Sequence, residues 1–402
     1  MATENNNKNL NVPNLRFPEF SGEWSLEELK DIATLSKGSG ISKDQLSDSG
    51  NPCILYGELY TKYKSEIIRE VVSKTDIDSF NLVQSKANDV IIPCSGEAAI
   101  EIATARCVTM DDVLLGGDLN IIRLSDQDGG FFAYQLNGKR KVDIAKVAQG
   151  VSVVHLYGEH LKRVKVAYPS LMEQQKISSF LTLLDERIAT QIKIIEDLKK
   201  LKSAISKQIF VQKPICWNRL DTLFSKGKAG GTPTSTNKDY YNGVIPFLSI
   251  NDITKQGKYI RYTENHLSQS GLDNSSAWIV PAHSLIMSMY ASVGLVTINE
   301  VPIATSQAMF AMQLKDKGLL DYLYYYLSYF KYRHIHKYLE TGTQSNINAD
   351  IVRSIMIPDY GHGRNTKIAS TLQSIDAKID NELSVLEQFN KQKNYLSSQM
   401  FI

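Results

Sequence analysis

The sequence predicts a duplicated α+β protein, in which two domains of mixed sheet and helices are joined and spaced by two long helices. We expect these helices to form an antiparallel coiled coil with pseudo-two-fold symmetry. Residues 173–210 and 364–401 contain no Gly or Pro and carry an apolar residue every three or four positions, which is typical of long amphipathic helices. The two segments superpose without a gap at a shift of 191 residues. The chain is therefore a tandem duplication.

Composition is consistent with two or three globular domains in 402 residues, because 43% hydrophobic and 22% charged residues are ordinary values for soluble proteins. No apolar run approaches the roughly 18 to 20 residues that span a bilayer, and residues 1–11 are polar and Asn-rich. We expect a cytoplasmic protein with no membrane contact. The four cysteines have no metal-binding spacing, so buried thiols are expected instead of a metal site.

Matching landmarks in the two halves divide the chain into five segments. Trp24 and Trp217 open equivalent segments that lead into Gly-rich loops, and Pro169 and Pro358 precede the long helices. We expect an N-terminal tail, a first domain, a central helix, a second domain and a C-terminal helix, with these bounds: 1–20, 21–169, 170–212, 213–358 and 359–402.

Short apolar runs between Gly, Pro, Asn and Asp residues predict the strands of each domain. These runs are Asp89–Pro93, Asn120–Leu124, Arg163–Ala167, Val244–Ile250, Ser284–Met287, Met309–Leu314 and Ser354–Ile357. Residues 319–340 have helical periodicity.

A heptad frame predicts the seam between the long helices. Eight of ten seam positions are apolar in each helix, which indicates a coiled coil; two separate amphipathic helices are the alternative. The seam positions nearest the middle are Leu181, Leu184, Ile188, Gln191, Ile195 and Leu198 in the first helix, and Leu372, Ile375, Ile379, Glu382, Leu386 and Phe389 in the second.

The polar seam residues predict the direction of pairing. A parallel pair would bring the seam lysines Lys202 and Lys393 together, two like charges that are partly removed from water. An antiparallel pair separates them and places Gln191 opposite Glu382, where a polar pair can fix the register. At 1.5 Å per residue the rod is at most roughly 57 Å long, which suits two modules that contact one face of a DNA duplex.

The order of motifs resembles the specificity subunit of type I restriction-modification enzymes. The second half carries GGTPTSTNKDYYNGVIPFLSINDI and TGTQSNINADIVRSIMIP, and the first half carries KGSGISKDQ, GGDLNIIRL and QGVSVVHLYGEHLKRVKVAYPSLMEQQKI. The resemblance covers nearly everything after Pro13. One departure is the start of the second helix, where GHGRNTKI replaces the entry seen as PSLMEQQKI in the first half.

The resemblance implies that two target-recognition domains each read one half of a split, asymmetric DNA sequence. The paired helices would space these domains and dock two DNA methyltransferase subunits, through which restriction and translocase subunits join. The chain would supply recognition without catalysis and hold no cofactor, since S-adenosylmethionine, ATP and Mg would reside on the partner subunits.

Candidate DNA contacts lie in Gly-rich loops and in polar segments with small hydroxyls, amides and aromatics. Backbone N–H groups and lysines can meet phosphate, and a Gln can pair with adenine; the alternative is that these are ordinary turns. The candidates are Lys37, Ser39, Tyr56, Glu58, Ser95, Glu97, Lys139, Arg140, Lys226, Lys228, Thr232, Ser288, Tyr290, Ser292, Ser306, Gln307, Arg333, Lys337, Thr343 and Gln344.

The segment Tyr322–Tyr338 combines a tyrosine-rich half, which suggests core packing, with a basic end that suggests phosphate contact. The Cys94-Ser95-Gly96 run has no His at a recognisable spacing and is therefore not expected to be a nucleophile. A function of a different class also fits the repeat: a coiled-coil scaffold or adaptor whose globular domains bind protein.

Overall fold

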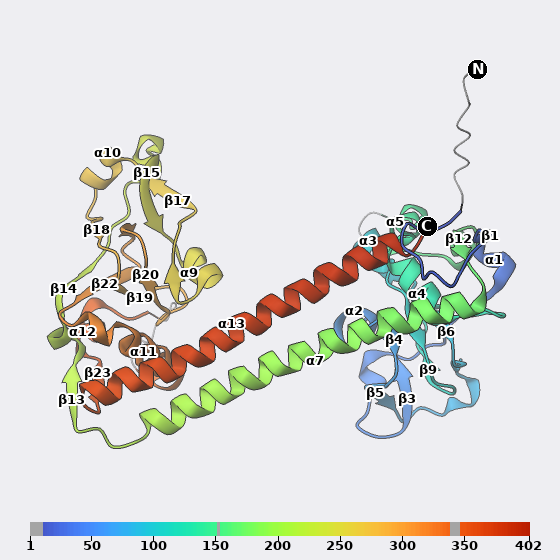
Figure 1. The fold of residues 1–402 in the computed structure, drawn as a ribbon, viewed down its shortest axis with the longest axis horizontal. Coiled ribbons are helices and arrows are strands. Elements are labelled where there is room, and N and C mark those ends of the chain that lie inside the picture. Colours follow the sequence, from blue (N-terminus) through green and yellow to red (C-terminus); the bar gives the residue numbers. More distant parts are fainter. Residues whose placement is uncertain (1–10, 151–152, 338–345) are drawn as a thin grey trace. The chain divides into compact units, whose positions relative to one another are not determined.

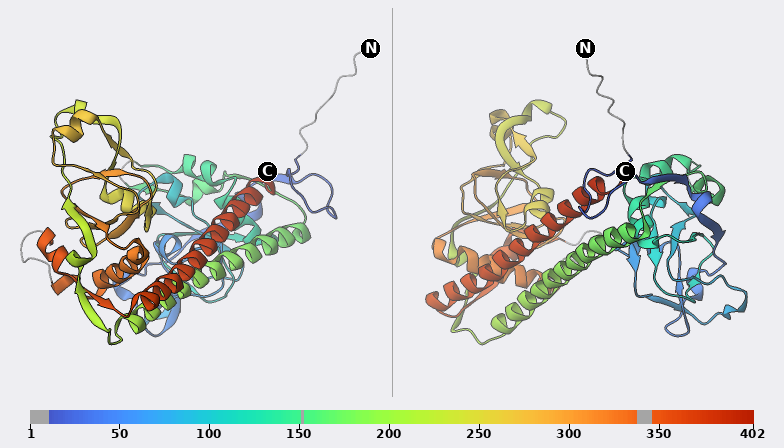
Figure 2. Two further views of the ribbon diagram at one scale, coloured as in Figure 1. Left: turned by 60° about the vertical axis from the view of Figure 1, so that its left-hand side comes forward. Right: turned by 45° about the vertical axis from the view of Figure 1, so that its right-hand side comes forward.

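The chain folds into two compact units, each built from one domain and from parts of both long helices. In the computed structural model, residues 11–150, 153–337 and 346–402 are described. The first unit comprises Met1–Lys193 and Leu383–Ile402, and the second comprises Ile194–Glu382. Figure 1 labels their elements, and the right-hand and left-hand views of Figure 2 bring forward the first and the second unit respectively.

A five-stranded mixed sheet is the centre of the first unit. Its strands, in spatial order, are β2 (Ala33–Lys37), β10 (Leu119–Leu124), β6 (Asp89–Pro93), β8 (Arg106–Val108) and β4 (Ile67–Ile68). All neighbours are antiparallel except β4 and β8. Smaller sheets pair β3 (Asn51–Ile54) with β5 (Ser73–Thr75) and β9 (Leu114–Leu115), β1 (Ser25–Glu28) with β12 (Lys165–Tyr168), and β7 (Ser95–Gly96) with β11 (Val154–His155).

The second unit repeats this sheet with the same order and directions. Its strands are β14 (Phe224–Ala229), β22 (Met309–Leu314), β19 (Leu285–Ser288), β20 (Val296–Asn299) and β16 (Tyr259–Ile260), and again only the last pair is parallel. A four-stranded sheet adds β17 (Asn265–Leu267), β15 (Tyr241–Leu248), β21 (Ile303–Thr305) and β18 (Ile279–Val280), and β13 (Cys216–Arg219) pairs with β23 (Met356–Asp359). The predicted duplication and mixed-sheet fold are confirmed.

Each predicted strand is present within two or three residues of its expected bounds, but the helix predicted at residues 319–340 is shorter. It forms α11 (Leu320–Arg333) and stops where His334 leaves the helical region at φ −130°. Its first-unit counterpart is α4 (Gly129–Asn137), in which every residue except Asn137 is buried. The remaining short helices are α1 (Leu29–Ile32), α2 (Glu58–Thr61), α3 (Ala99–Ile102), α5 (Lys141–Val147), α6 (Gly158–Leu161), α8 (Leu220–Leu223), α9 (Ile250–Gln256), α10 (Gln269–Asp273) and α12 (Ala349–Ser354).

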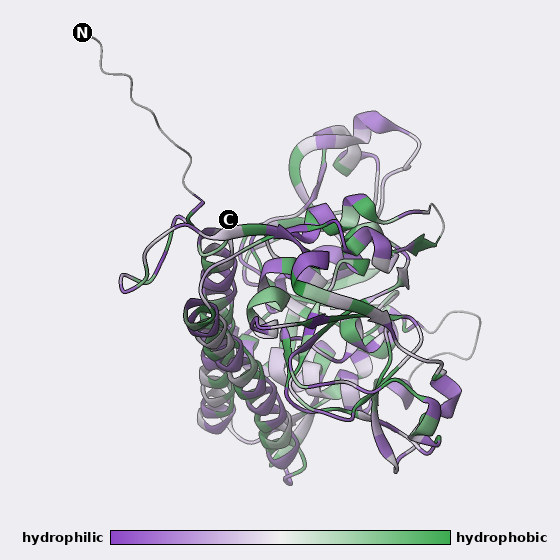
Figure 3. Cartoon of the chain, turned by 90° about the vertical axis from the view of Figure 1, so that its right-hand side faces the viewer, coloured by the Kyte–Doolittle hydropathy of each residue, from purple (hydrophilic) through white to green (hydrophobic). Residues whose placement is uncertain are grey.

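The two long helices are α7 (Leu171–Phe210) and α13 (His362–Gln399), each starting two residues before its predicted bound. Hydrophilic and hydrophobic residues alternate along both helices (Figure 3), and none of the twelve named seam positions is classed as exposed. In the first unit Asp185, early in α7, contacts Lys393, late in α13; in the second unit Lys202, late in α7, contacts Asp376, early in α13. The helices therefore run antiparallel, as predicted. The Gln191 and Glu382 pairing stays a prediction, because the two residues belong to different units.

The last turn of α13 and the residues after it complete the core of the first unit. Leu396, Met400 and Phe401 are buried in the same apolar cluster as Phe131 of α4, and the rings of Phe131 and Phe401 lie 5.1 Å apart. In the second unit, Phe210 at the end of α7 packs against Tyr322 and Tyr326 of α11. The predicted role of the tyrosine-rich half of residues 322–338 as core packing is confirmed for these two residues.

Candidate nucleic-acid interface

Three loops meet at one end of the strands of the main sheet in the first unit. The Gly-rich loop after β2 crosses the turn before β10, since Gly38 N donates to Leu119 O (3.0 Å) and Ser39 N donates to Leu115 O (2.9 Å). The loop after β6 joins the same turn, because Cys94 N donates to Asp118 O (2.7 Å). We call residues 38–40, 94–97 and 116–118 the first three-loop site.

The second unit repeats all three hydrogen bonds. Gly230 N donates to Met309 O (3.1 Å), Gly231 N to Thr305 O (2.9 Å) and Met289 N to Ala308 O (2.7 Å). Residues 230–232, 289–292 and 306–308 form the second three-loop site. Residues 94–97 and the segment from Ser288 onward, which both contain candidate DNA contacts, therefore occupy equivalent positions in the backbone.

These bonds also change one alignment that the sequence suggested. The string Ser-Lys-Gly occurs at residues 36–38 and 225–227, which would place Gly38 opposite Gly227. The structural counterpart of Gly38 is instead Gly230. Gly227 lies within β14, which is longer than β2 and has a bulge between Phe224 and Lys226. A local insertion of this kind is invisible to an alignment of the short Ser-Lys-Gly motif.

Glycine is required where the loops cross. A Cβ on Gly38 would lie 2.0 Å from Gly116 O, and a Cβ on Gly230 would lie 1.8 Å from Thr305 O. Both atoms are backbone and cannot move aside without shifting the turn. Close approach of two chains therefore explains the Gly-rich sequence at both sites.

The first three-loop site presents Asp118 and Glu97 to solvent, whereas Ser95 is buried. Asp118 is exposed, and Ser95 Oγ donates to its Oδ2 (2.6 Å). Ser39 Oγ accepts from Val83 N (2.7 Å), so that hydroxyl holds the loop together. Glu97 and Lys37 are exposed. Tyr56 is 40% exposed and lines a cavity of about 570 Å³ beside Asp118.

The second three-loop site carries different chemistry. Thr232 Oγ1 donates to Gln307 Oε1, and both residues are exposed. Tyr290 is 39% exposed, and the next two residues, Ala291 and Ser292, both have positive φ (37° and 53°). Such strain in non-glycine residues is concentrated at functional loops. Ser306 is half-buried in the turn.

Other predicted contacts lie elsewhere or are used inside the fold. Glu58 is 5% exposed, and its carboxylate accepts from Leu55 N (3.0 Å) and pairs with Lys62 (2.6 Å). Ser288 is buried, and its Oγ donates to Ser292 O (2.9 Å). These two side chains shape loops instead of facing solvent.

The predicted basic residues are mostly exposed but lie outside the three-loop sites. Lys139 and Arg140 lie between α4 and α5, and Arg140 Nη1 contacts Asp143 at 3.4 Å. Lys228 is exposed on β14, and Lys226 Nζ lies 4.3 Å from the ring centre of Trp278. Arg333 is the last residue of α11, and Lys337 lies just beyond the helix. Between them, burial and, to a smaller extent, the positive charges nearby lower the pKa of His334. Thr343 and Gln344 lie outside the described residues.

Asp118 is the exposed polar residue that the sequence interpretation missed. Its Gly-Gly-Asp context looks like ordinary turn chemistry, and only the matching backbone bonds show that it occupies the same turn as Gln307. The motif GGDLNIIRL, which aligns with SQAMFAMQL once the bulge is allowed for, was the available signal.

Beneath each domain, a lysine, an aspartate and a tyrosine join both long helices to the domain. In the first anchor, Lys393 Nζ lies 2.6 Å from Asp185 Oδ1, and Tyr134 OH donates to Asp185 Oδ2 (2.7 Å). In the second anchor, Lys202 pairs with Asp376, and Tyr325 OH donates to Asp376 Oδ2 (2.8 Å). Corresponding members are 191 residues apart in sequence.

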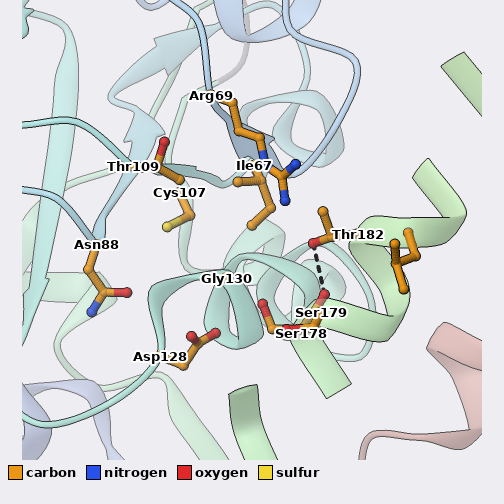
Figure 4. Close-up of a pocket in the computed structure, with 11 residues that line it drawn as sticks. Ile67, Arg69, Asn88, Cys107, Thr109, Asp128, Gly130, Ser178, Ser179 and Thr182 are labelled. Atoms are coloured by element: carbon orange, nitrogen blue, oxygen red, sulfur yellow. Dashed lines mark hydrogen bonds between the residues drawn. The ribbon is translucent and has the colours of Figure 1, made fainter. Parts of the chain in front are cut away.

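A cleft also recurs beside the N-terminal part of each long helix. The first has a volume of about 470 Å³, and Figure 4 shows Arg69, Asp128 and Thr182 around it. The second has about 370 Å³ and includes Arg261 and Gln373. Arg69 and Arg261 directly follow β4 and β16, and Thr182 and Gln373 are 191 residues apart.

Neither cleft has the donor set of a metal centre. Within residues 11–150, 153–337 and 346–402, the structure contains no group of three or more His, Cys, Asp or Glu side chains able to hold a metal ion. In the same part of the chain, no helix is both long and apolar enough to cross a membrane.

Duplicated domains with equivalent loop sites, carried on paired helices, define a modular recognition protein. Residues 21–200 and 216–390 both match the family described as Type I restriction modification DNA specificity domain. The chain belongs to this family: it is a DNA specificity subunit of a type I restriction-modification system, a non-catalytic component.

Curated relatives are named as specificity subunits of the same kind, and a solved structure shares the fold. The chain is 24% identical to the putative type I restriction enzyme MjaX specificity subunit of Methanocaldococcus jannaschii, over 96% of this chain and 94% of that protein. It is 27% identical to the MjaIX specificity subunit of the same organism, over 38% of this chain and 36% of that protein. The fold is similar to the S subunit structure from M. genitalium, with a TM-score of 0.62, 15% identity and coverage of 97% of this chain and 99% of that one.

Proposed function

We propose that residues 21–169 and 213–358 each read one half of a split, asymmetric sequence in double-stranded DNA. The observation that carries this proposal is the repetition of the three-loop site with the same backbone hydrogen bonds and different exposed side chains. A common frame presents the loops to DNA, and the variable side chains select the bases. Two different readers on one frame give an asymmetric target.

The helical segments 170–212 and 359–402 space these readers and dock two methyltransferase subunits in our proposal. Two features support docking surfaces on these helices: the recurrent clefts beside α7 and α13, and large apolar side chains that are exposed mostly on α7. The exposed apolar residues are Leu171, Met172, Phe180, Leu183, Ile192, Ile194 and Leu201 on α7, and Leu383 and Tyr395 on α13. Exposed apolar groups of this size commonly mark protein interfaces. Restriction and translocase subunits join through the methyltransferases.

S-adenosylmethionine, ATP and Mg belong to these partner subunits in the same proposal, and the complex acts in the cytoplasm, where its DNA is. The exposed basic side chains, including Lys37, Lys139, Lys228, Arg333 and Lys337, supply phosphate contacts. Such contacts set affinity and salt dependence without selecting sequence.

The test is to exchange residues 213–358 for the corresponding domain of another specificity subunit and to map methylated adenines with the methyltransferase partner. The wild-type complex should methylate a bipartite motif with a fixed spacer, and the exchange should change one half only. A change in both halves contradicts independent readers. Methylation without a bipartite motif, together with no salt-dependent DNA binding, would favour a coiled-coil scaffold whose domains bind protein.

A further inference from the structure

The turn before β10 and the turn before β22 each carry one exposed polar side chain, Asp118 or Gln307, that is hydrogen-bonded to a neighbouring loop. Each turn is held from two sides by the backbone hydrogen bonds of the neighbouring loops. In the second unit, Met309 N also donates to Ser306 O (3.1 Å), which closes the turn on itself. A side chain on such a frame loses little entropy on binding.

The two turns offer opposite hydrogen-bonding groups. Asp118 presents a carboxylate, which only accepts, and Ser95 Oγ already occupies its Oδ2. Gln307 accepts from Thr232 at Oε1, which fixes the amide so that Nε2 points both of its hydrogens away from that bond. Within the described residues Nε2 has no partner, so it is available to donate.

We infer that these two residues determine specificity in the two half-sites: Asp118 accepts from the N4 amino group of a cytosine, and Gln307 recognises an adenine. This inference rests on the proposed function of the domains as separate DNA readers. Asp118 favours cytosine over adenine, since the N7 lone pair beside the adenine amino group repels a carboxylate. Gln307 donates from Nε2 to adenine N7 and uses the second lone pair of Oε1 to accept from N6.

Conservative variants isolate these bonds. Asp118→Asn replaces one acceptor oxygen by a donor, and Gln307→Glu removes the donor to N7. Thr232→Val keeps Gln307 and removes only the bond that orients it. Matched controls make the same changes at the opposite ends of the same strands: Asp126→Asn after β10, and Gln313→Glu within β22, close to its end.

The experiment maps the motif methylated by each variant complex on a DNA library, together with the melting temperature of each chain. Asp118→Asn should lower the preference for cytosine at one position of the first half-site by roughly tenfold to a hundredfold, and Gln307→Glu should do the same for adenine in the second. Thr232→Val should weaken the same adenine preference less. Both controls should leave the motif unchanged.

Folded variants that keep the wild-type motif overturn the inference. A uniform change in affinity for all DNA sequences also overturns the inference. It would show that the charge removed or added by the substitution affects only the interaction with phosphates. Neither result affects the domain-exchange experiment, which still tests the proposed function independently. If the exchange itself changes neither half-site, the domains are not the readers, and the proposed function fails instead.

Discussion

The two anchors beneath the domains have the same three residue types but different surroundings. In the first, Lys393 contacts two carboxylates, Asp185 and Glu66, at 2.6 and 2.7 Å. In the second, the described residues give Lys202 a single carboxylate partner, Asp376, and a further lysine, Lys258, pairs with Asp321 nearby (2.7 Å). The half-buried Arg106 also acts electrostatically on both Glu66 and Asp185 of the first anchor. The first anchor therefore shares one lysine between two acids, with Arg106 as a second cation that forms no ion pair within the described residues, whereas in the second each of two lysines pairs with its own acid.

In both anchors, the seam lysine connects the two long helices to each other and also connects them to the adjacent domain. Each lysine forms an ion pair with the opposite helix and lies near the tyrosine ring of the adjacent domain, at 5.7 Å for Lys393 and Tyr134 and 5.2 Å for Lys202 and Tyr325. A lysine that interrupts the apolar seam of the coiled coil is therefore the point where the helix pair contacts the domain. The triad, which occurs in both halves of the chain, joins the helix pair to each domain, and its surroundings set its contribution to stability.

Replacing each lysine by methionine should separate the two anchors most clearly. Lys393→Met leaves two carboxylates with 13% and 7% exposure without their ion-pair partner, while the positive charge of Arg106 still acts on both. We expect a loss of about 3 kcal/mol in unfolding free energy. Lys202→Met should cost about 1 kcal/mol, because Lys202 and Asp376 are 28% and 24% exposed. Denaturant unfolding followed by circular dichroism measures both losses.

A suitable control is Lys200→Met, because Lys200 is 75% exposed on α7. It should change the unfolding free energy by less than about 0.5 kcal/mol. Equal losses for Lys393→Met and Lys202→Met would contradict the contrast drawn between the anchors.

The tyrosine hydroxyls should behave alike in the two anchors. Tyr134→Phe and Tyr325→Phe each remove a hydrogen bond to the anchor aspartate, at 2.7 and 2.8 Å. Each also removes a longer contact of the hydroxyl, with Thr182 at 3.4 Å or with Lys258 at 3.2 Å. Each substitution should therefore cost about 1 kcal/mol. Thermal unfolding of the two variants measures these losses of stability. Tyr332→Phe is the control, because Tyr332 is 79% exposed. A large difference between them would show that the triads are not equivalent.

The smallest expected effect is a pH dependence that belongs to the first anchor. Burial raises the pKa of Glu66 above its ordinary value of 4.5, so the folded state binds this proton more tightly than the unfolded state. The resulting stability is present below about pH 4.5 and is lost as the pH rises through the folded-state pKa.

We therefore expect the melting temperature of the wild type, relative to Glu66→Gln, to fall between pH 4.5 and pH 7. The exposed Glu23→Gln control should show no such trend relative to the wild type. A relative rise over this range would mean that the charge of Lys393 outweighs burial at Glu66.

The long helices and their direction were predictable because heptad periodicity is local and because two lysines in the seam favour only one orientation. The partners of those lysines were not predictable, since Tyr134 and Glu66 reach the anchor through the fold of the domain. The same limit applies to the loops. The glycines indicate a close crossing of two chain segments, but the sequence does not show which turn they cross. Asp118 was not predicted as a contact, because its Gly-Gly-Asp context resembles an ordinary turn.

Burial of Phe401 against Phe131 has a consequence for synthesis. The last strand of the first domain is β12, but the core of the domain also includes residues 396–401. These residues are synthesised more than two hundred residues later. At 5–20 residues per second this delay is on the order of ten seconds or more. During that time the nascent first domain exposes an apolar surface around Phe131, so its final folding is coupled to the synthesis of the second helix.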